Sequence, residues 1–132
     1  MLSHKSSENI LSAELLLTNK IYNSIPHCAY YACFQLICHI NGNKQKPANG
    51  QGSHEEIIKV IYNDLKSDDK KSKCNFKFNL TPNKVKDKIY KLKELRSIAD
   101  YNDELIDSEI ASNCIEESKS IITILNYFYN PQ

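Results

Sequence analysis

The chain has 132 residues, the size of a single domain, and its charges almost cancel, because 17 Lys and Arg face 16 Asp and Glu. A formal net charge of +1 argues against a globally basic nucleic-acid-binding protein. The five Cys include no Cys-x-x-Cys pair, so neither a zinc site nor a disulfide framework is indicated, and no apolar run is long enough for a signal peptide or a membrane span. We therefore expect one cytoplasmic domain that has no membrane segment and binds neither metal nor cofactor.

A first helix is predicted near the N-terminus. Ser6 or Ser7 is a suitable N-cap, and the apolar stripe that follows ends near residues 19–22. At helical spacing this stripe contains Ile10, Ala13, Leu17 and Ile21.

The second predicted helix has Pro26 in its first turn and runs to Asn41, where Gly42 stops it. Its residues are apolar or aromatic on nearly every side, and they include the pair Tyr30 and Tyr31. Because a helix with no polar face must be hidden from water, we expect several neighbours to cover it.

Three further helices complete the pattern. A polar loop ends at Ser53, which caps a third helix together with Glu56, and the inward positions of this helix are Ile57, Val60, Ile61 and Leu65. Residues 67–79 are the least structured part, with room for a short extended piece at residues 74–78. Thr81 and Pro82 begin a fourth helix that reaches Tyr101, and Ser108 begins a fifth.

No strand pairs are visible, so the pattern predicts an all-α fold in which four to five helices form an antiparallel up-and-down bundle. The whole chain, residues 1–132, is one domain in this interpretation, with its core at about residues 8–129.

Arg96, the one arginine of the chain, lies on the inward stripe of the fourth helix. At about 100° per residue it is about 20° from Val85 around the helix axis. Asp100 follows one turn later, so Arg96 and Asp100 can form an ion pair, for which the planar guanidinium is well suited. Such a pair is either purely structural or the positive end of a functional site.

Four segments resemble HEPN domains. The string Leu-Lys-Glu-Leu-Arg-Ser-Ile-Ala-Asp-Tyr, residues 92–101, resembles the arginine motif of that family, and Cys-Ala-Tyr-Tyr-Ala-Cys-Phe, residues 28–34, resembles its upstream helix. Residues 13–16 and the Ser-Glu-Ile-Ala string at 108–111 extend the likeness. The resemblance implies a dimerising helical bundle with a site at Arg96.

In HEPN ribonucleases the motif arginine is followed, four to six residues later, by a histidine. Here Tyr101 stands five residues after Arg96, and no histidine follows it. Tyrosine is a poor general base at neutral pH, and Tyr101 lies about 140° around the helix from Arg96. The resemblance is therefore closest to HEPN proteins that lack nuclease activity and accompany a nucleotidyltransferase, which can modify a tyrosine near the arginine motif.

We therefore predict a homodimer that binds a nucleotide, RNA or a partner protein and belongs to a toxin–antitoxin or defence-type module. Its expected binding residues are Arg96, Asp100, Tyr101, Tyr30 and Tyr31. One alternative is a metal-independent endoribonuclease in which Arg96 stabilises the phosphate and Tyr101 or His54 replaces the missing base. Another is an interaction scaffold with Arg96 and Asp100 locked in a buried pair.

The lysines are unevenly distributed. Residues 66–93 contain ten Lys and three Asp, whereas residues 94–117 contain eight acidic residues and one Arg. This gradient predicts a salt-dependent attraction between the lysine-rich segment and a polyanion such as RNA, or a second copy of the chain.

Overall fold

The computed structural model describes residues 2–42, 53–67, 81–101 and 105–129. They form five α-helices, and this part of the chain contains no strand, as the sequence pattern predicts. The helices are α1 (Leu2–Thr18), α2 (Ile25–Asn41), α3 (Ser53–Ser67), α6 (Pro82–Tyr101) and α7 (Ser108–Tyr129). The predicted loop at 43–52 and the predicted extended piece at 74–78 lie outside the described residues.

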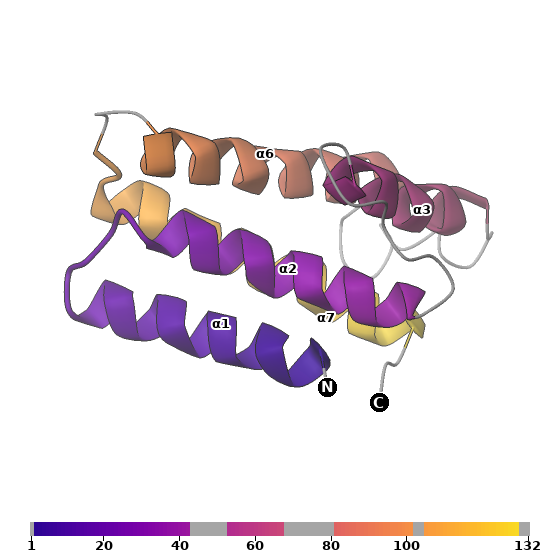
Figure 1. The fold of residues 1–132 in the computed structure, drawn as a ribbon, viewed down its shortest axis with the longest axis horizontal. Coiled ribbons are helices and arrows are strands. Elements are labelled where there is room, and N and C mark those ends of the chain that lie inside the picture. Colours follow the sequence, from indigo (N-terminus) through magenta and orange to yellow (C-terminus); the bar gives the residue numbers. More distant parts are fainter. Residues whose placement is uncertain (1, 43–52, 68–80, 102–104, 130–132) are drawn as a thin grey trace.

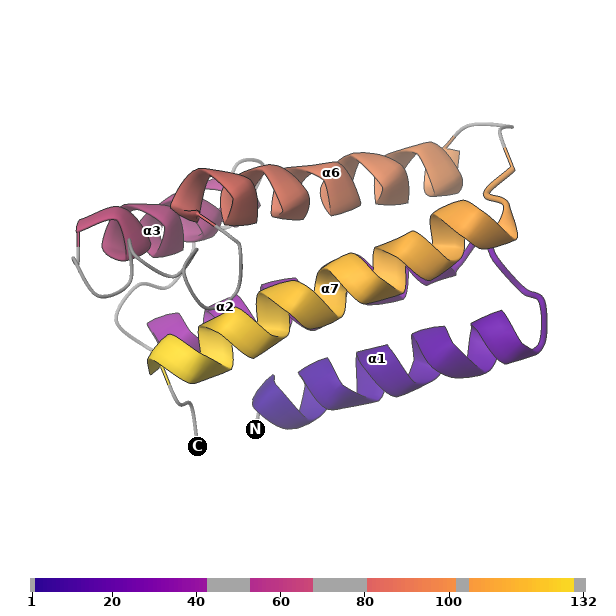
Figure 2. The ribbon, with the colours of Figure 1, turned by 180° about the vertical axis from the view of Figure 1, so that it is seen from behind.

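The helices form a bundle around α2. Figure 1 shows α1, α2 and α6 side by side, with α7 behind α2, and Figure 2 shows α7 from the other side. The colours show that α1 and α2 run in opposite directions, as do α6 and α7. The shorter α3 packs against α2 and against α6. No helix in the described ranges is long and apolar enough to cross a bilayer.

The central position of α2 follows from its composition. Its two tyrosines, its cysteines and its aliphatic side chains leave no polar face, and all four other helices contact it. Its buried residues are Ile25, Pro26, Ala29, Tyr30, Ala32, Cys33, Phe34, Leu36, Ile37 and Asn41. Apolar stripes of the outer helices are buried as well, for example Ile57, Ile61 and Leu65 of α3 and Val85, Ile89 and Leu92 of α6.

Most of the helix ends follow the local sequence. Pro26 lies in the first turn of α2, and Gly42 ends that helix with a φ of +56°, a conformation that suits glycine. Thr81 caps α6, because its Oγ1 accepts a hydrogen bond of 3.2 Å from the backbone N–H of Lys84. At α7 the cap is Asp107, whose Oδ1 accepts from the Ile110 N–H at 2.8 Å, one residue before the predicted Ser108.

The sequence interpretation of α1 was wrong in three respects. The helix begins at Leu2, because Ser6 is buried and donates to the Ala32 carbonyl at 2.6 Å instead of capping a helix. It ends at Thr18, and Ile21, which we expected on the buried stripe, is 52% exposed. The turn there places Lys20 at a φ of +60°, where the Ile21 N–H reaches back to the Leu16 carbonyl and directs the chain into α2.

A buried hydroxyl joins α2 to α7. Ser118 is fully buried, donates to the Ala29 carbonyl at 2.8 Å and lies 3.2 Å from the Cys33 sulfur. The small side chain lets the two helix backbones approach, and the hydrogen bond satisfies a polar group that is removed from water.

We expect Ser118→Ala to lower the free energy of unfolding by about 1–2 kcal/mol, because a buried hydrogen bond between helices is lost. The measurement is urea unfolding followed by circular dichroism. Ser120→Ala is the matched control, since Ser120 is exposed on the same helix and bonds only to the Glu116 carbonyl. An equal loss of stability in the two variants would contradict this role of Ser118.

Candidate functional site around Arg96

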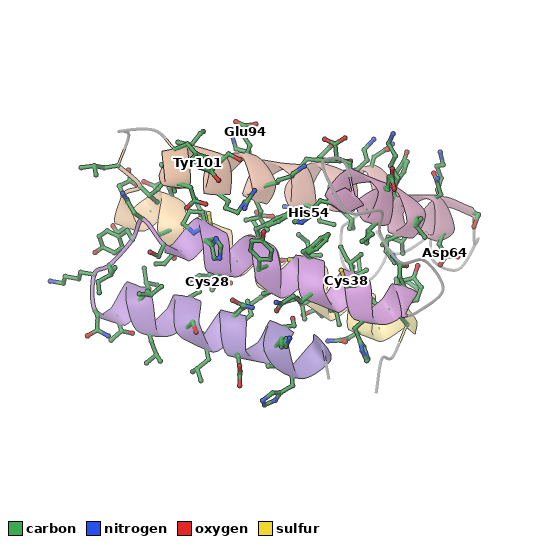
Figure 3. The ribbon with its side chains drawn as sticks, in the orientation of Figure 1. Cys28, Cys38, His54, Asp64, Glu94 and Tyr101 are labelled. Carbon is green, nitrogen blue, oxygen red and sulfur yellow. The ribbon has the colours of Figure 1, made fainter. Side chains whose placement is uncertain are left out.

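Three helices bring aromatic and basic side chains together around Arg96. The residues, called the Arg96 cluster below, are His27, Tyr30, Tyr31 and Phe34 from α2, His54 from α3 and Arg96 from α6. The four residues of α2 lie on one helical face, because their spacing is three or four residues. Figure 3 shows His54 at the place where α3 meets α2.

The rings of the cluster are in continuous contact. The His54 ring stacks on Phe34 with centroids 4.0 Å apart and an interplanar angle of 13°. The Tyr30 and Tyr31 rings meet edge to face at 5.2 Å, and His27 lies 4.7 Å from Tyr31. Aromatic pairs at such distances stabilise one another by about 0.5–1.5 kcal/mol beyond their burial, so the rings hold one another in place.

Arg96 lies over the two tyrosines. Its guanidinium carbon is 5.5 Å from the Tyr30 ring centroid and 5.4 Å from that of Tyr31, and Nη1 donates to the Tyr31 hydroxyl at 3.3 Å. The Nε atom is buried and has no hydrogen-bond partner among the described residues. The prediction that Arg96 points inward is thus confirmed, and the aromatic faces offset part of the cost of placing a cation there.

The predicted ion pair between Arg96 and Asp100 does not form. Both residues are described, and Arg96 makes no ion pair with any carboxylate in that part of the chain. Asp100 instead lies 3.9 Å from Nδ1 of His27, in the first turn of α2, where the helix N-terminus also attracts a carboxylate. The scaffold alternative loses its central contact, and the guanidinium keeps its capacity to bind an anion.

His54 is the histidine that tertiary folding brings to Arg96. Its Nδ1 is 2.9 Å from the Tyr30 hydroxyl, which fixes the orientation of the ring. Burial lowers the pKa of His54 below its ordinary 6.5, and the charges of Lys93 and Arg96 lower it further. The imidazole is therefore neutral at physiological pH and able to accept a proton.

Two predicted site residues have different surroundings from those expected. Tyr30 is fully buried, so it supports Arg96 and His54 from within the core and offers no face to a ligand, whereas Tyr31 is partly exposed. Tyr101 is 80% exposed at the end of α6 and makes no contact with Arg96 among the described residues. Figure 3 shows it well separated from His54, as its angle around the helix requires.

Sequence reasoning did not include Phe34, His27 or Lys93 in the site. The signal for the first two was present, because they share a helical face with Tyr30 and Tyr31. Lys93 precedes Arg96 by almost one turn and pairs with Glu55, which follows His54, at 3.6 Å. This ion pair ties the start of α3 to α6 beside the cluster.

Comparisons of the chain with protein-family models, curated proteins and solved structures found no match.

Several lysines of the lysine-rich segment have local partners in the part of the chain that the structure describes. Where the segment is described, Lys66 and Lys86 lie over the Tyr62 ring, at 4.7 and 4.4 Å from its centroid. Further lysines pair with acids, namely Lys88 with Glu117, Lys91 with Glu94 and Lys93 with Glu55. Five of the lysines described in this segment thus already have a ring or a carboxylate as a local partner.

A groove of about 570 Å³ lies between α6 and α7 and shares no residue with the Arg96 cluster. Leu92, Leu95 and Cys114 line it, and the ion pair between Lys88 and Glu117 joins the two helices beside it. Burial raises the pKa of Cys114 to about 11, so its thiol stays protonated and unreactive. In the described ranges no three His, Cys, Asp or Glu side chains are arranged to hold a metal ion.

We expect His54 to titrate below 6.5 in the folded protein and at its ordinary value in urea, as measured by NMR of the imidazole ring. Because the unfolded chain binds the proton more readily, this histidine also makes the fold less stable as the pH falls below 6.5.

Lys93→Gln is expected to raise the pKa of His54 without restoring its unfolded value, since the burial remains. Lys91→Gln is the control, because Lys91 is exposed and pairs with Glu94 on its own helix. A His54 midpoint that is the same in the folded and unfolded chain would contradict the burial described here.

Proposed function

We propose that the Arg96 cluster binds a phosphate group of RNA. The observation that carries this proposal is the environment of Arg96, a guanidinium that lies over two tyrosine rings without a carboxylate partner among the described residues. A guanidinium binds phosphate through two parallel hydrogen bonds. Because the tyrosine rings already restrict the arginine side chain, phosphate binding costs less of its conformational entropy. A free nucleotide offers the same phosphate chemistry.

The side chains around Arg96 suit a nucleic acid. Tyr31 is partly exposed beside the guanidinium and can stack on a base, and His27 extends the same aromatic surface. Lys93, although paired with Glu55, adds positive charge near the phosphate. Together these groups provide one anion site beside exposed aromatic rings. Such a site suits single-stranded RNA better than a duplex, because unpaired bases can stack on the rings.

The homodimer and the nucleotidyltransferase partner belong to the same proposal, because the resemblance to HEPN domains implies both. Exposed apolar side chains on α1 and in the connection before α7 offer surfaces for such contacts, namely Leu11, Leu15 and Leu105. Tyr101 remains the proposed acceptor for a modifying partner, and its 80% exposure leaves its hydroxyl accessible. The proposal that the protein belongs to a toxin–antitoxin or defence-type module depends on this nucleotidyltransferase partner.

The binding proposal predicts that Arg96→Gln weakens the affinity for a fluorescein-labelled oligouridine by roughly 10- to 100-fold, because a charge-assisted contact to phosphate is lost. Fluorescence anisotropy at several KCl concentrations measures this. The slope of log affinity against log salt should also fall, by about 0.7 for one phosphate contact on a single strand.

The control is Lys5→Gln, an exposed lysine on α1 that is not part of the cluster. Equal effects of the two substitutions, or binding that does not respond to salt, would show that Arg96 is not the phosphate site.

A second candidate function is metal-independent cleavage of RNA. It is favoured by one observation, the position of His54 in the same cluster as Arg96. The neutral tautomer with its proton on Nδ1 donates to the Tyr30 oxygen and leaves the lone pair on Nε2 free for the ribose 2′-hydroxyl. Arg96 would stabilise the charge that develops on the phosphate, and His54 would take the role of the missing motif histidine.

If the cluster cleaves RNA, His54→Ala and Arg96→Gln should each lower the rate by at least about 100-fold in buffer with EDTA, while binding is weakened only by Arg96→Gln. The products, separated on a denaturing gel, should carry 2′,3′-cyclic phosphates. His4→Ala, which alters an exposed imidazole on α1, is the control. Intact RNA with every protein would leave phosphate binding as the function of the cluster.

A further inference from the structure

Cationic side chains continue from Arg96 along the contact between α3 and α6, called the α3–α6 seam below (Figure 1). Lys93 pairs with Glu55 of α3 at 3.6 Å. Lys86 lies almost two turns earlier on α6 and contacts the Tyr62 ring of α3. The two lysines share one face of α6, because seven residues return a helix to within about 20° of its starting direction.

At the far end of the seam, two lysines from different helices meet at one tyrosine. Lys66 of α3 and Lys86 of α6 have their ammonium nitrogens 4.7 and 4.4 Å from the centroid of the Tyr62 ring. The Tyr62 hydroxyl donates to Oδ1 of Asn83 at 2.7 Å, so the ring is held between the two helices. Because the ring carries no net charge, its contacts orient the ammonium groups without neutralising them. Neither lysine forms an ion pair with a carboxylate in the described ranges, so both can still bind an anion.

The two ends of the seam are separated by a distance that a nucleic-acid strand can span. Lys86 and Arg96 are ten positions apart on one continuous helix, which corresponds to about 15 Å along its axis. Successive nucleotides of a stacked strand rise by about 3.4 Å, so this distance corresponds to about four or five nucleotides. A mononucleotide is too short to contact both ends.

We propose that a single strand of RNA lies along the α3–α6 seam, with one phosphate at Arg96 and another at Lys66 and Lys86. This inference rests on the phosphate binding proposed for the Arg96 cluster. Lys93 lies between the two phosphate positions, and Tyr31, which is partly exposed beside Arg96, supplies a ring on which a base can stack. Two separate phosphate positions favour a polynucleotide over a free nucleotide, and the stacking ring favours it over an acidic peptide.

The test measures how well unlabelled oligouridines of two lengths displace a fluorescein-labelled octamer, by fluorescence anisotropy. We expect Lys66→Gln combined with Lys86→Gln to weaken the affinity for an unlabelled octamer about 10-fold, because one charge-assisted phosphate contact is lost. The slope of log affinity against log salt should fall by about 0.7 for this contact. The dinucleotide pUpU reaches only Arg96, so its affinity should change by less than about 2-fold. Arg96→Gln, in contrast, should weaken the binding of both lengths.

The matched control is Lys5→Gln combined with Lys84→Gln. It removes the same two charges from exposed lysines of α1 and α6 that are not part of the seam. Lys84 lies about 160° from Lys86 around the axis of α6. The dinucleotide is an internal control for folding, because a variant that lost its fold would lose affinity for both lengths.

Several results would overturn the inference. Equal losses of octamer affinity in the seam variant and the control would show that only net charge matters. If the seam variant weakens the binding of both lengths equally, its lysines do not form a second phosphate position. Displacement of the labelled octamer by polyglutamate as effectively as by oligouridine would assign the seam to an acidic peptide.

Two further results separate this inference from the proposed function. If the wild-type protein binds the octamer and the dinucleotide equally tightly, the ligand does not extend beyond Arg96, and the phosphate site stands without the seam. If it binds neither, the phosphate site fails together with the seam.

Discussion

The structure depends on the need to bury α2. A helix with so few polar side chains is stable in water only when other helices cover most of its surface, and α1, α3, α6 and α7 all pack against α2. Each outer helix needs only one apolar stripe for this purpose, and the rest of its surface is free to carry charge. The bundle therefore has a single apolar core in the described residues, and polar side chains lie at the seams between helices.

The Arg96 cluster lies in one of these seams. Tyr30 is fully buried in the core, and its hydroxyl is hydrogen-bonded to His54. The hydroxyl of its neighbour Tyr31 accepts a hydrogen bond from Arg96. The same packing that hides the apolar face of α2 thus orients the two polar side chains most suited to phosphate chemistry. Burial at the seam also explains why His54 is neutral.

Much of the fold could be predicted from local signals. Pro26, Gly42 and Thr81 mark helix ends by their own backbone preferences, so their roles did not depend on the rest of the molecule. The start of α1 could not be predicted in this way, because Ser6 has the same local propensity whether it caps a helix or bonds to the Ala32 carbonyl of another helix. The difference lies in a contact between residues far apart in sequence.

The same distinction applies to the site. Helical periodicity predicts that Arg96 points inward, but it cannot say what lies opposite, and Asp100, the carboxylate one helical turn away, is not its partner in the structure. The position of His54 relative to Arg96 depends on how α3 packs against α2 and α6, which no local pattern encodes. The motif position predicts Tyr101 as a site residue, but its side chain points into solvent, away from the cluster.

The division of the cluster among helices has a consequence for how such a protein changes over time. Tyr30 and Phe34 are core residues, so their loss would cost stability regardless of function, and selection for a folded bundle alone would retain them. Arg96, His54 and His27 lie at the edges of the seam and are not among the buried residues of the apolar core. Single substitutions at these three positions can therefore change the polar side chains of the seam while the apolar core of the bundle is kept.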